Sequence, residues 1–206
     1  MARDKKNLIV GLDIGTSYVK TIVGSINEDS EIEIEGVGRS KSLGMKRGVV
    51  IDISSTVDSI EKSIEDAELM SGERISSVYF SISGNHIQSI SADGRAAISD
   101  HNEVTNQDLK SVEESAKAIT LSNDQEILHL IPKDYVIDKQ YGIKVPLGMS
   151  GTAIDGRYHL IIGAKNARDN IEKCIKKCSI KPETVVLEQL ASSMSVLTED
   201  EKELGV

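Results

Sequence analysis

A short turn between two apolar segments near the N-terminus constrains the fold of this chain most strongly. Residues 8–14 are mostly aliphatic and residues 18–23 are rich in β-branched side chains, so both segments are predicted to be β-strands. The turn that joins them reads Asp13-Ile14-Gly15-Thr16-Ser17, and Lys20 follows on the second strand. The sequence therefore predicts a β-hairpin whose turn can hold an anion.

The residue types in this turn suit a phosphate group. Gly15 allows a positive φ or a close approach of a ligand to the backbone. The amides of Gly15, Thr16 and Ser17 can then point to one side and form an anion-binding concavity. The two hydroxyls add donors, and Lys20 adds a positive charge. A carboxylate such as Asp13 fits beside a phosphate when a hydrated Mg²⁺ lies between them. The alternative is an ordinary hairpin with a solvated lysine.

Composition and charge argue against several classes of partner. With 206 residues the chain forms one or two domains, and its 39% hydrophobic residues suffice for a core. The formal net charge of −9 argues against nucleic acid or an anionic membrane as the main partner. No apolar run reaches the ~18 residues of a membrane span, and the first residues lack a signal-peptide core. We expect a cytosolic protein.

Cysteine and histidine residues do not predict a metal site made of protein ligands alone. Cys174 and Cys178 are four residues apart and share a predicted helix face with Ile171 and Ile175, which favours a place in the core. The four histidines are scattered and lack the spacing of metal ligands.

The N-terminal part predicts three strands, a helix and a fourth strand. The third strand covers residues 31–39, and Gly36, Gly38, Gly44 and Gly48 indicate a glycine-rich connection after it. A helix over residues 52–69 has a start resembling a capping box at Ser55 and Asp58, and it ends at Gly72. The fourth strand, over residues 75–83, alternates apolar and polar side chains.

The middle of the chain is β-rich and contains one helix, which predicts a small inserted subdomain. Asp93-Gly94 indicates a hairpin within residues 87–98. Thr105 and Asp108 begin the helix, and Pro132 predicts a bulge or an edge position in a strand over residues 126–137. A further apolar strand follows over residues 158–163.

The last segment returns to the first pattern, with a helix over residues 167–178, a strand over 184–187 and a helix from 188 to 197. Residues 198–203 are acidic and predict a turn, and apolar residues that could begin a new strand follow. We interpret the chain as a cut form of a longer protein, with a natural frayed tail as the alternative.

This order of elements resembles the first domain of the actin, Hsp70 and hexokinase-like ATPases, in which the Asp-x-Gly-Thr turn is the first phosphate-binding loop. Four stretches narrow the resemblance to the FtsA family of bacterial actin-like cell-division proteins. They are residues 43–48, 75–87, 145–151 and 190–206. The resemblance covers nearly all of the chain.

The resemblance implies an α/β, actin-like (ribonuclease H-like) fold. Residues 1–83 and 163–206 would form an incomplete subdomain 1A. Residues 84–162 would form the inserted, β-rich α+β subdomain 1C. In the family, 1C contacts the next protomer of a filament and is linked to binding the cytoplasmic tail of FtsN.

The resemblance also implies a scaffold that tethers FtsZ polymers to the inner membrane and links them to later division proteins. Contact with FtsZ and with the membrane, the latter through a C-terminal amphipathic helix, would use parts absent from this chain. Localisation would be cytoplasmic, at the inner-membrane face of the division site.

For the site, the resemblance implies ATP and Mg²⁺ as cofactors of the full-length protein. Asp13 would contact Mg²⁺ through water, while Gly15, Thr16, Ser17 and Lys20 would hold the β- and γ-phosphates. Glu188 aligns with the glutamate of the Glu-Pro-x-Ala connecting motif of Hsp70-like and MreB-like relatives, which assists the metal and water there. Gln189 stands where those relatives have proline. The alternative for Glu188 is a helix-starting acid favoured by the helix dipole.

Two alternatives stay open. A type IV pilus assembly protein of the PilM kind shares the actin-like frame and a 1C-like subdomain. A sugar or acid kinase of the same superfamily is the second, but phosphoryl transfer needs phosphates clamped from both sides and this chain supplies one. We expect no enzyme activity from the 206-residue chain and at most a slow ATPase in the full-length protein.

Overall fold

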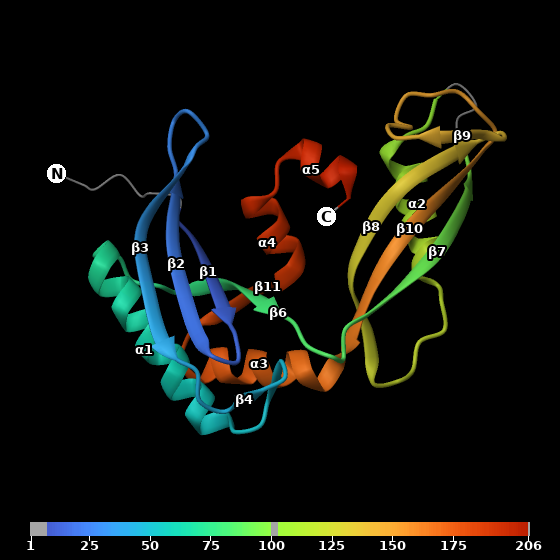
Figure 1. Ribbon diagram of the computed structural model, residues 1–206. Coiled ribbons are helices and arrows are strands. Elements are labelled where there is room, and N and C mark those ends of the chain that lie inside the picture. Colours follow the sequence, from blue (N-terminus) through green and yellow to red (C-terminus); the bar gives the residue numbers. More distant parts are fainter. Residues whose placement is uncertain (1–7, 100–102, 206) are drawn as a thin grey trace. The chain divides into compact units, whose positions relative to one another are not determined.

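The computed structural model describes residues 8–99 and 103–205 (Figure 1). The chain divides into two compact units. Unit 1 consists of residues Met1–His86 and Asn166–Val206, and unit 2 is the continuous segment Ile87–Lys165 between them. The boundaries predicted for subdomains 1A and 1C, after residues 83 and 162, stay a prediction.

Unit 1 contains a five-stranded mixed sheet with the order β11-β6-β1-β2-β3. Its β1, β2 and β3 pair antiparallel, whereas β6 runs parallel to both of its neighbours. A short hairpin, β4–β5, follows β3. The strands are β1 (Leu8–Ile14), β2 (Tyr18–Ile26), β3 (Ile32–Lys41), β4 (Met45–Lys46), β5 (Val49–Val50), β6 (Ser77–Ile82) and β11 (Lys181–Leu187).

Four helices accompany this sheet, and they are α1 (Ile53–Ser71), α3 (Lys165–Lys177), α4 (Glu188–Val196) and α5 (Glu199–Leu204). Helix α1 packs against β2 and β3. Helix α3 contacts α1, since the Cys174 Sγ lies 4.0 Å from the Ile53 carbonyl oxygen. Helix α4 borders the opposite face of the sheet, where Ile22 and Tyr79 are exposed. One face of the sheet is thus closed by two helices, and the other is partly open.

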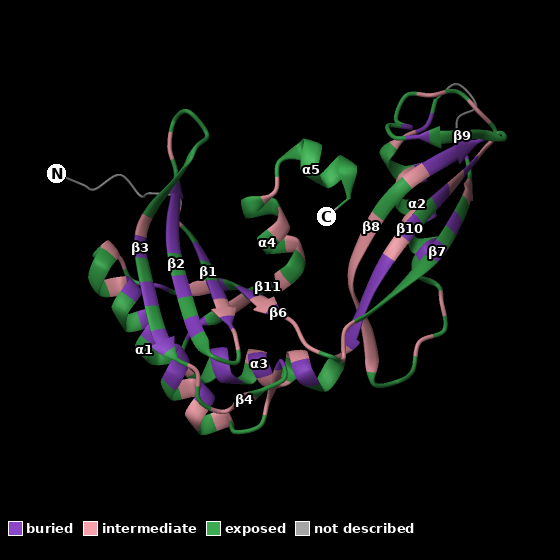
Figure 2. Ribbon diagram, viewed as in Figure 1, coloured by how far each residue is buried: buried purple, intermediate pink, exposed green. Residues whose placement is uncertain are grey.

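Alternation of buried and exposed residues along the strands separates these two faces (Figure 2). In β1, Leu12 and Ile14 are buried, so Asp13 between them must face the other way. In β2, Val19 and Val23 are buried, and Lys20 on the opposite face is exposed. The buried side chains meet α1 and α3 and form the core of the unit.

The predicted glycine-rich loop is partly wrong, because Gly36 and Gly38 lie inside β3. A Cβ at Gly38 would overlap the Ser63 carbonyl oxygen of α1. Glycine therefore lets the helix backbone approach the strand directly. The polar contact between Thr21 Oγ1 and Ser63 Oγ, at 2.8 Å, lies in the same seam.

Helix α1 begins where the sequence predicts, but the capping box predicted at Ser55 and Asp58 is wrong. Its N-cap is Asp52, whose carboxylate accepts a hydrogen bond from the Ser55 amide at 3.0 Å, so Ser55 lies in the first turn. The predicted end is confirmed, because Gly72 is the C-cap with a φ of 70°. At the other end of unit 1, the predicted turn after residue 197 is instead α5, which has a capping box between Thr198 and Glu201.

Unit 2 is a four-stranded antiparallel sheet with the order β7-β10-β8-β9, and one helix packs on β7 and β10. The elements are β7 (Gln88–Ala97), α2 (Asn106–Lys117), β8 (Gln125–Ile137), β9 (Gln140–Ile143) and β10 (Ala153–Ala164). The core between helix and sheet consists of Ile98, Val104, Val112, Ala116, Tyr135, Ile137, Ile143, Ile154 and Tyr158.

Two predictions for unit 2 have opposite outcomes. The Asp93-Gly94 hairpin is wrong, because β7 pairs with β10 without interruption from Gln88 to Ala97 and Gly94 lies beneath α2. Pro132 does mark a bulge in β8, where the register with β10 shifts between Arg157 and Tyr158. The predicted start of α2 at Thr105 and Asp108 is confirmed, and the structure shows that these two residues form a capping box.

Candidate functional site

The Asp-Ile-Gly-Thr-Ser turn joins β1 to β2 as predicted. However, one of the three amides predicted to bind an anion is used within the turn itself. The Gly15 amide donates to the Tyr18 carbonyl at 3.1 Å, so it is occupied within the hairpin. A Cβ at Gly15 would lie 3.0 Å from that same oxygen, which explains the glycine by close packing. The amides of Thr16 and Ser17, both exposed residues, are those left for an anion.

Asp13 lies at the centre of a polar row across three adjacent strands. On one side Lys20, its cross-strand partner in β2, places Nζ 3.2 Å from Oδ2. On the other side the Ser81 hydroxyl of β6 donates to Oδ1 at 2.8 Å. The same Ser81 oxygen accepts a hydrogen bond from the Ile14 amide at 3.2 Å. Each carboxylate oxygen of Asp13 therefore has a hydrogen-bond donor, Ser81 for Oδ1 and Lys20 for Oδ2.

This row opens into a pocket of about 510 Å³ within unit 1. Asp13, Lys20 and Ser81 form part of one wall, and Glu188, Ser192 and Ser195 of α4 form part of the other. The structure thus brings three of the predicted site residues together, namely Asp13, Lys20 and Glu188. Gly15, Thr16 and Ser17 are not among its lining residues and belong to the adjoining turn.

Ser81 is the member of this group that sequence reasoning missed. It occupies a polar position in the alternating strand, and such positions usually face solvent. Its role depends on the parallel pairing of β1 with β6, which joins residues 68 positions apart. The sequence shows only a serine between the apolar residues Phe80 and Ile82, which does not indicate a contact with Asp13.

Glu188 is the first residue of α4 and directly follows β11. A carboxylate there interacts favourably with the positive end of the helix dipole, which is the alternative to a functional role. Its presence in the wall of the pocket is compatible with both interpretations.

The donor set suits Mg²⁺ held through water. Within residues 8–99 and 103–205, no group of three histidine, cysteine or acidic side chains is placed to hold a metal ion. The Asp13 side chain is 31% exposed and that of Lys20 is 51% exposed, so water and phosphate can reach both. Mg²⁺ commonly binds one or two carboxylates, several waters and substrate phosphates. The residues present fit such a group.

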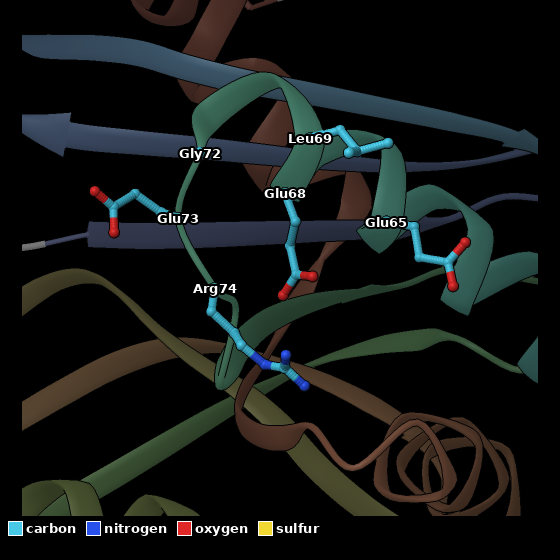
Figure 3. Close-up of a pocket in the computed structure, with 6 residues that line it drawn as sticks. All are labelled: Glu65, Glu68, Leu69, Gly72, Glu73 and Arg74. Atoms are coloured by element: carbon cyan, nitrogen blue, oxygen red, sulfur yellow. The ribbon is translucent and has the colours of Figure 1, made fainter.

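A second, open pocket of about 530 Å³ lies at the end of α1 (Figure 3). Glu65, Glu68 and Glu73 surround it, together with Leu69 and Arg74. Glu68 is already engaged, because its Oε1 accepts the Ile75 amide at 2.7 Å and joins the helix to the next strand. We therefore interpret this pocket as a hollow formed by the end of α1 and not as a functional site.

Unit 2 carries a different kind of surface. On the face of its sheet opposite α2, Arg157 of β10 forms two hydrogen bonds to Asp134 of β8, at 2.5 and 2.6 Å. The Arg157 guanidinium lowers the pKa of the Asp134 carboxyl. Tyr141 and Val145, near β9, are exposed by more than two thirds (72% and 74%).

Comparison with known proteins gives three findings. The family model described as "SHS2 domain inserted in FTSA" matches residues 84–162. The cell division protein FtsA of Pseudomonas aeruginosa is 48% identical over 97% of this chain, and that of Neisseria meningitidis is 45% identical over 95%. FtsA of Escherichia coli K12 is 43% identical over 100%. The chain spans about half the length of these curated relatives (48%, 47% and 48%).

A solved structure supports the fold. A chain of the PilM-PilN type IV pilus biogenesis complex superposes with a TM-score of 0.64 over 90% of this chain and 49% of its own. Its sequence identity is 13%, so the likeness concerns the actin-like fold alone. Among the described residues, none of the helices has the length and apolar character needed to cross a membrane.

Proposed function

The chain belongs to the FtsA family of cell-division proteins, and we propose that it forms the nucleotide-sensing and partner-binding part of an actin-like scaffold at the division site. In this proposal unit 1 contributes one side of a site for ATP and Mg²⁺. Unit 2 contributes a surface for protein partners. The whole protein acts at the cytoplasmic face of the inner membrane and tethers FtsZ polymers there.

The observation that carries the nucleotide proposal is the row formed by Lys20, Asp13 and Ser81 beside the turn. A lysine and a carboxylate that share one pocket can serve a phosphate and a hydrated cation, respectively. The Thr16 and Ser17 amides and hydroxyls add donors at the adjoining turn. In the proposed complex Lys20 contacts phosphate oxygens, Asp13 holds Mg²⁺ through water, and Glu188 completes the far wall.

Unit 2 is proposed to bind the cytoplasmic tail of FtsN and to contribute to self-association. Its support is the match of residues 84–162 to the SHS2 domain of FtsA, together with exposed Tyr141 and Val145. The net charge of −9 favours a basic peptide as partner. Contact with FtsZ and with the membrane is proposed for parts of the protein outside this chain.

The nucleotide proposal is tested by Asp13→Ala in the whole natural protein. We expect the affinity for ATP in the presence of Mg²⁺ to fall by about tenfold or more, which corresponds to ~1.4 kcal/mol. Isothermal titration calorimetry with Mg²⁺ and with EDTA measures the change. Asp29→Ala, in the exposed turn after β2, is the matched control. Unchanged Mg²⁺-dependent binding in Asp13→Ala would leave the turn as structure only.

A further inference from the structure

Ser81 connects the candidate metal carboxylate to the neighbouring strand by two hydrogen bonds. Its hydroxyl donates to Asp13 Oδ1 at 2.8 Å and accepts the Ile14 amide at 3.2 Å. A serine hydroxyl has one proton to donate. Because the Ile14 amide approaches the hydroxyl oxygen as a donor, the serine proton is directed to the carboxylate. The orientation of this hydroxyl is thereby set by the backbone of β1.

The two oxygens of Asp13 are held by donors of different kinds. Lys20 holds Oδ2 from a long side chain that is 51% exposed and free to change rotamer. Ser81 is a short side chain on β6, a strand hydrogen-bonded to β1 on one side and to β11 on the other, so its position is fixed. An arriving phosphate competes with Asp13 for Lys20, since both are anions within reach of one ammonium group. Once Lys20 turns to the phosphate, Ser81 is the donor that still holds the carboxylate.

From this geometry we infer that Ser81 is a positioning residue: it keeps the Asp13 carboxylate aimed into the pocket when Lys20 moves to phosphate. The inference rests on the proposed function of the turn as a site for nucleotide and Mg²⁺. Oδ2 then becomes free to accept hydrogen bonds from water on the cation, while Oδ1 stays bonded to Ser81. Residues that orient a metal-binding group from behind commonly change metal affinity by 10–100-fold when they are removed.

Ser81 could instead serve only to join β1 to β6. The two roles differ in what they affect. A purely structural contact influences the binding of ATP alike with and without Mg²⁺. A contact that orients Asp13 influences the Mg²⁺-dependent part, because the carboxylate repels free phosphate and becomes favourable only when a cation lies between them.

The experiment compares Ser81→Ala with Ser81→Thr in the whole natural protein. ATP affinity is measured by calorimetry with Mg²⁺ and again with EDTA for each variant. We expect Ser81→Ala to weaken binding of ATP with Mg²⁺ by about tenfold and to change binding in EDTA by less than about twofold. Ser81→Thr keeps the hydroxyl on a β-strand that tolerates branching, so it should restore the Mg²⁺ dependence.

Two controls separate folding from positioning. Ser77→Ala removes a hydroxyl from the same face of β6 outside the pocket, and it should leave both affinities unchanged. Hydrogen exchange of the Ile14 amide reports directly on the bond to Ser81, and its protection should fall in Ser81→Ala and persist in Ser81→Thr.

Each outcome decides the inference. Equal losses with Mg²⁺ and with EDTA in Ser81→Ala, or failure of Ser81→Thr to restore the difference, would overturn the positioning role and leave the proposed function intact. A wild-type protein that binds no ATP under either condition would instead overturn the proposed function, and this inference with it. A Mg²⁺-specific loss that Ser81→Thr restores supports both.

Discussion

Asp108 of unit 2 concentrates more hydrogen bonds than any other carboxylate described above. Its Oδ1 accepts from the Ser99 amide and hydroxyl, at 3.0 and 2.8 Å. Its Oδ2 accepts from the Thr105 amide and hydroxyl, at 2.9 and 2.7 Å. The side chain is buried, and it joins the end of β7 to the start of α2. These bonds to Thr105 and Ser99 hold the pKa of the Asp108 carboxyl well below its usual range.

Replacing Asp108 by asparagine should destabilise unit 2 by about 1–3 kcal/mol, because an amide group would face donors that need an acceptor. Wild-type stability should also fall in acid. Because the pKa of Asp108 is lowered in the folded state, its contribution to stability is complete above the unfolded pKa of about 3.9 and is lost as the pH falls towards the folded pKa. Urea unfolding monitored by NMR signals of unit 2 measures both effects. Exposed Asp93→Asn is the control, and equal loss in both variants would contradict the prediction.

Cys174 in α3 and Cys178 just after it are free thiols that lie against α1. Cys174 is buried, as the core interpretation of the spacing predicted, whereas Cys178 is only partly buried. Burial raises the pKa of the Cys178 thiol to about 12, with a further contribution from Glu61, and burial also raises the pKa of Cys174. Both should therefore stay protonated and react slowly with iodoacetamide at pH 8. Mass spectrometry of the folded protein measures this, and urea-unfolded protein supplies the fast reference. Rapid labelling of the folded protein would show the prediction to be wrong.

At the scale of elements, the close contact between α1 and β3 depends on glycines in β3, which have no side chain. Gly38→Ala would place a Cβ against the Ser63 carbonyl oxygen, so the helix must move away from the strand. We expect a loss of about 1–3 kcal/mol in the stability of unit 1. Gly11→Ala is the matched control, because a Cβ there meets nothing within 4 Å. Chemical denaturation followed by signals of unit 1 tests this, and equal stabilities of the two variants would argue against it.

Elements with a strong local pattern could be predicted from the sequence. The hairpin of β1 and β2 and the start of α2 at Thr105 and Asp108 depend on neighbouring residues, and the structure confirms both. Asp93-Gly94 shows where such reasoning fails. The pair is a common hairpin turn, but here Gly94 is required by the approach of α2, a helix that lies later in the chain. Gly36 and Gly38 likewise indicate a loop by their local pattern, but they lie in β3 where α1 approaches the strand. In each case tertiary packing, which no local pattern reveals, determined the use of the glycine.

The candidate site likewise contains residues that could be predicted from local sequence and residues that could not. Asp13 and Lys20 could be predicted because they lie seven residues apart in one hairpin. Their alignment with Ser81 could not, because it depends on the parallel pairing of strands distant in sequence. The bond that closes the turn at Gly15 also escaped prediction, since it requires the actual backbone path.

At the scale of the whole molecule, each unit has a core of its own. Buried residues between α2 and the sheet form the core of unit 2. The segment Ile87–Lys165 should therefore fold when it is produced alone. A heteronuclear NMR spectrum with dispersed amide signals and cooperative thermal unfolding would be the expected result. A matched segment lacking α2 should not fold, and a collapsed spectrum for the intact segment would contradict the prediction.

Because unit 2 lies between β6 and β11 in the sequence, it also determines the order in which the strands of unit 1 are synthesised. The strands β1, β2, β3 and β6 leave the ribosome first, but β11, which pairs with β6, is made only after all of unit 2. Chains emerge at ~5–20 residues per second, so one edge of β6 waits several seconds for its partner. Unit 2 is a continuous segment and can fold during that interval. Nascent chains of this protein therefore present an unpaired strand edge, a natural substrate for chaperones, until β11 arrives.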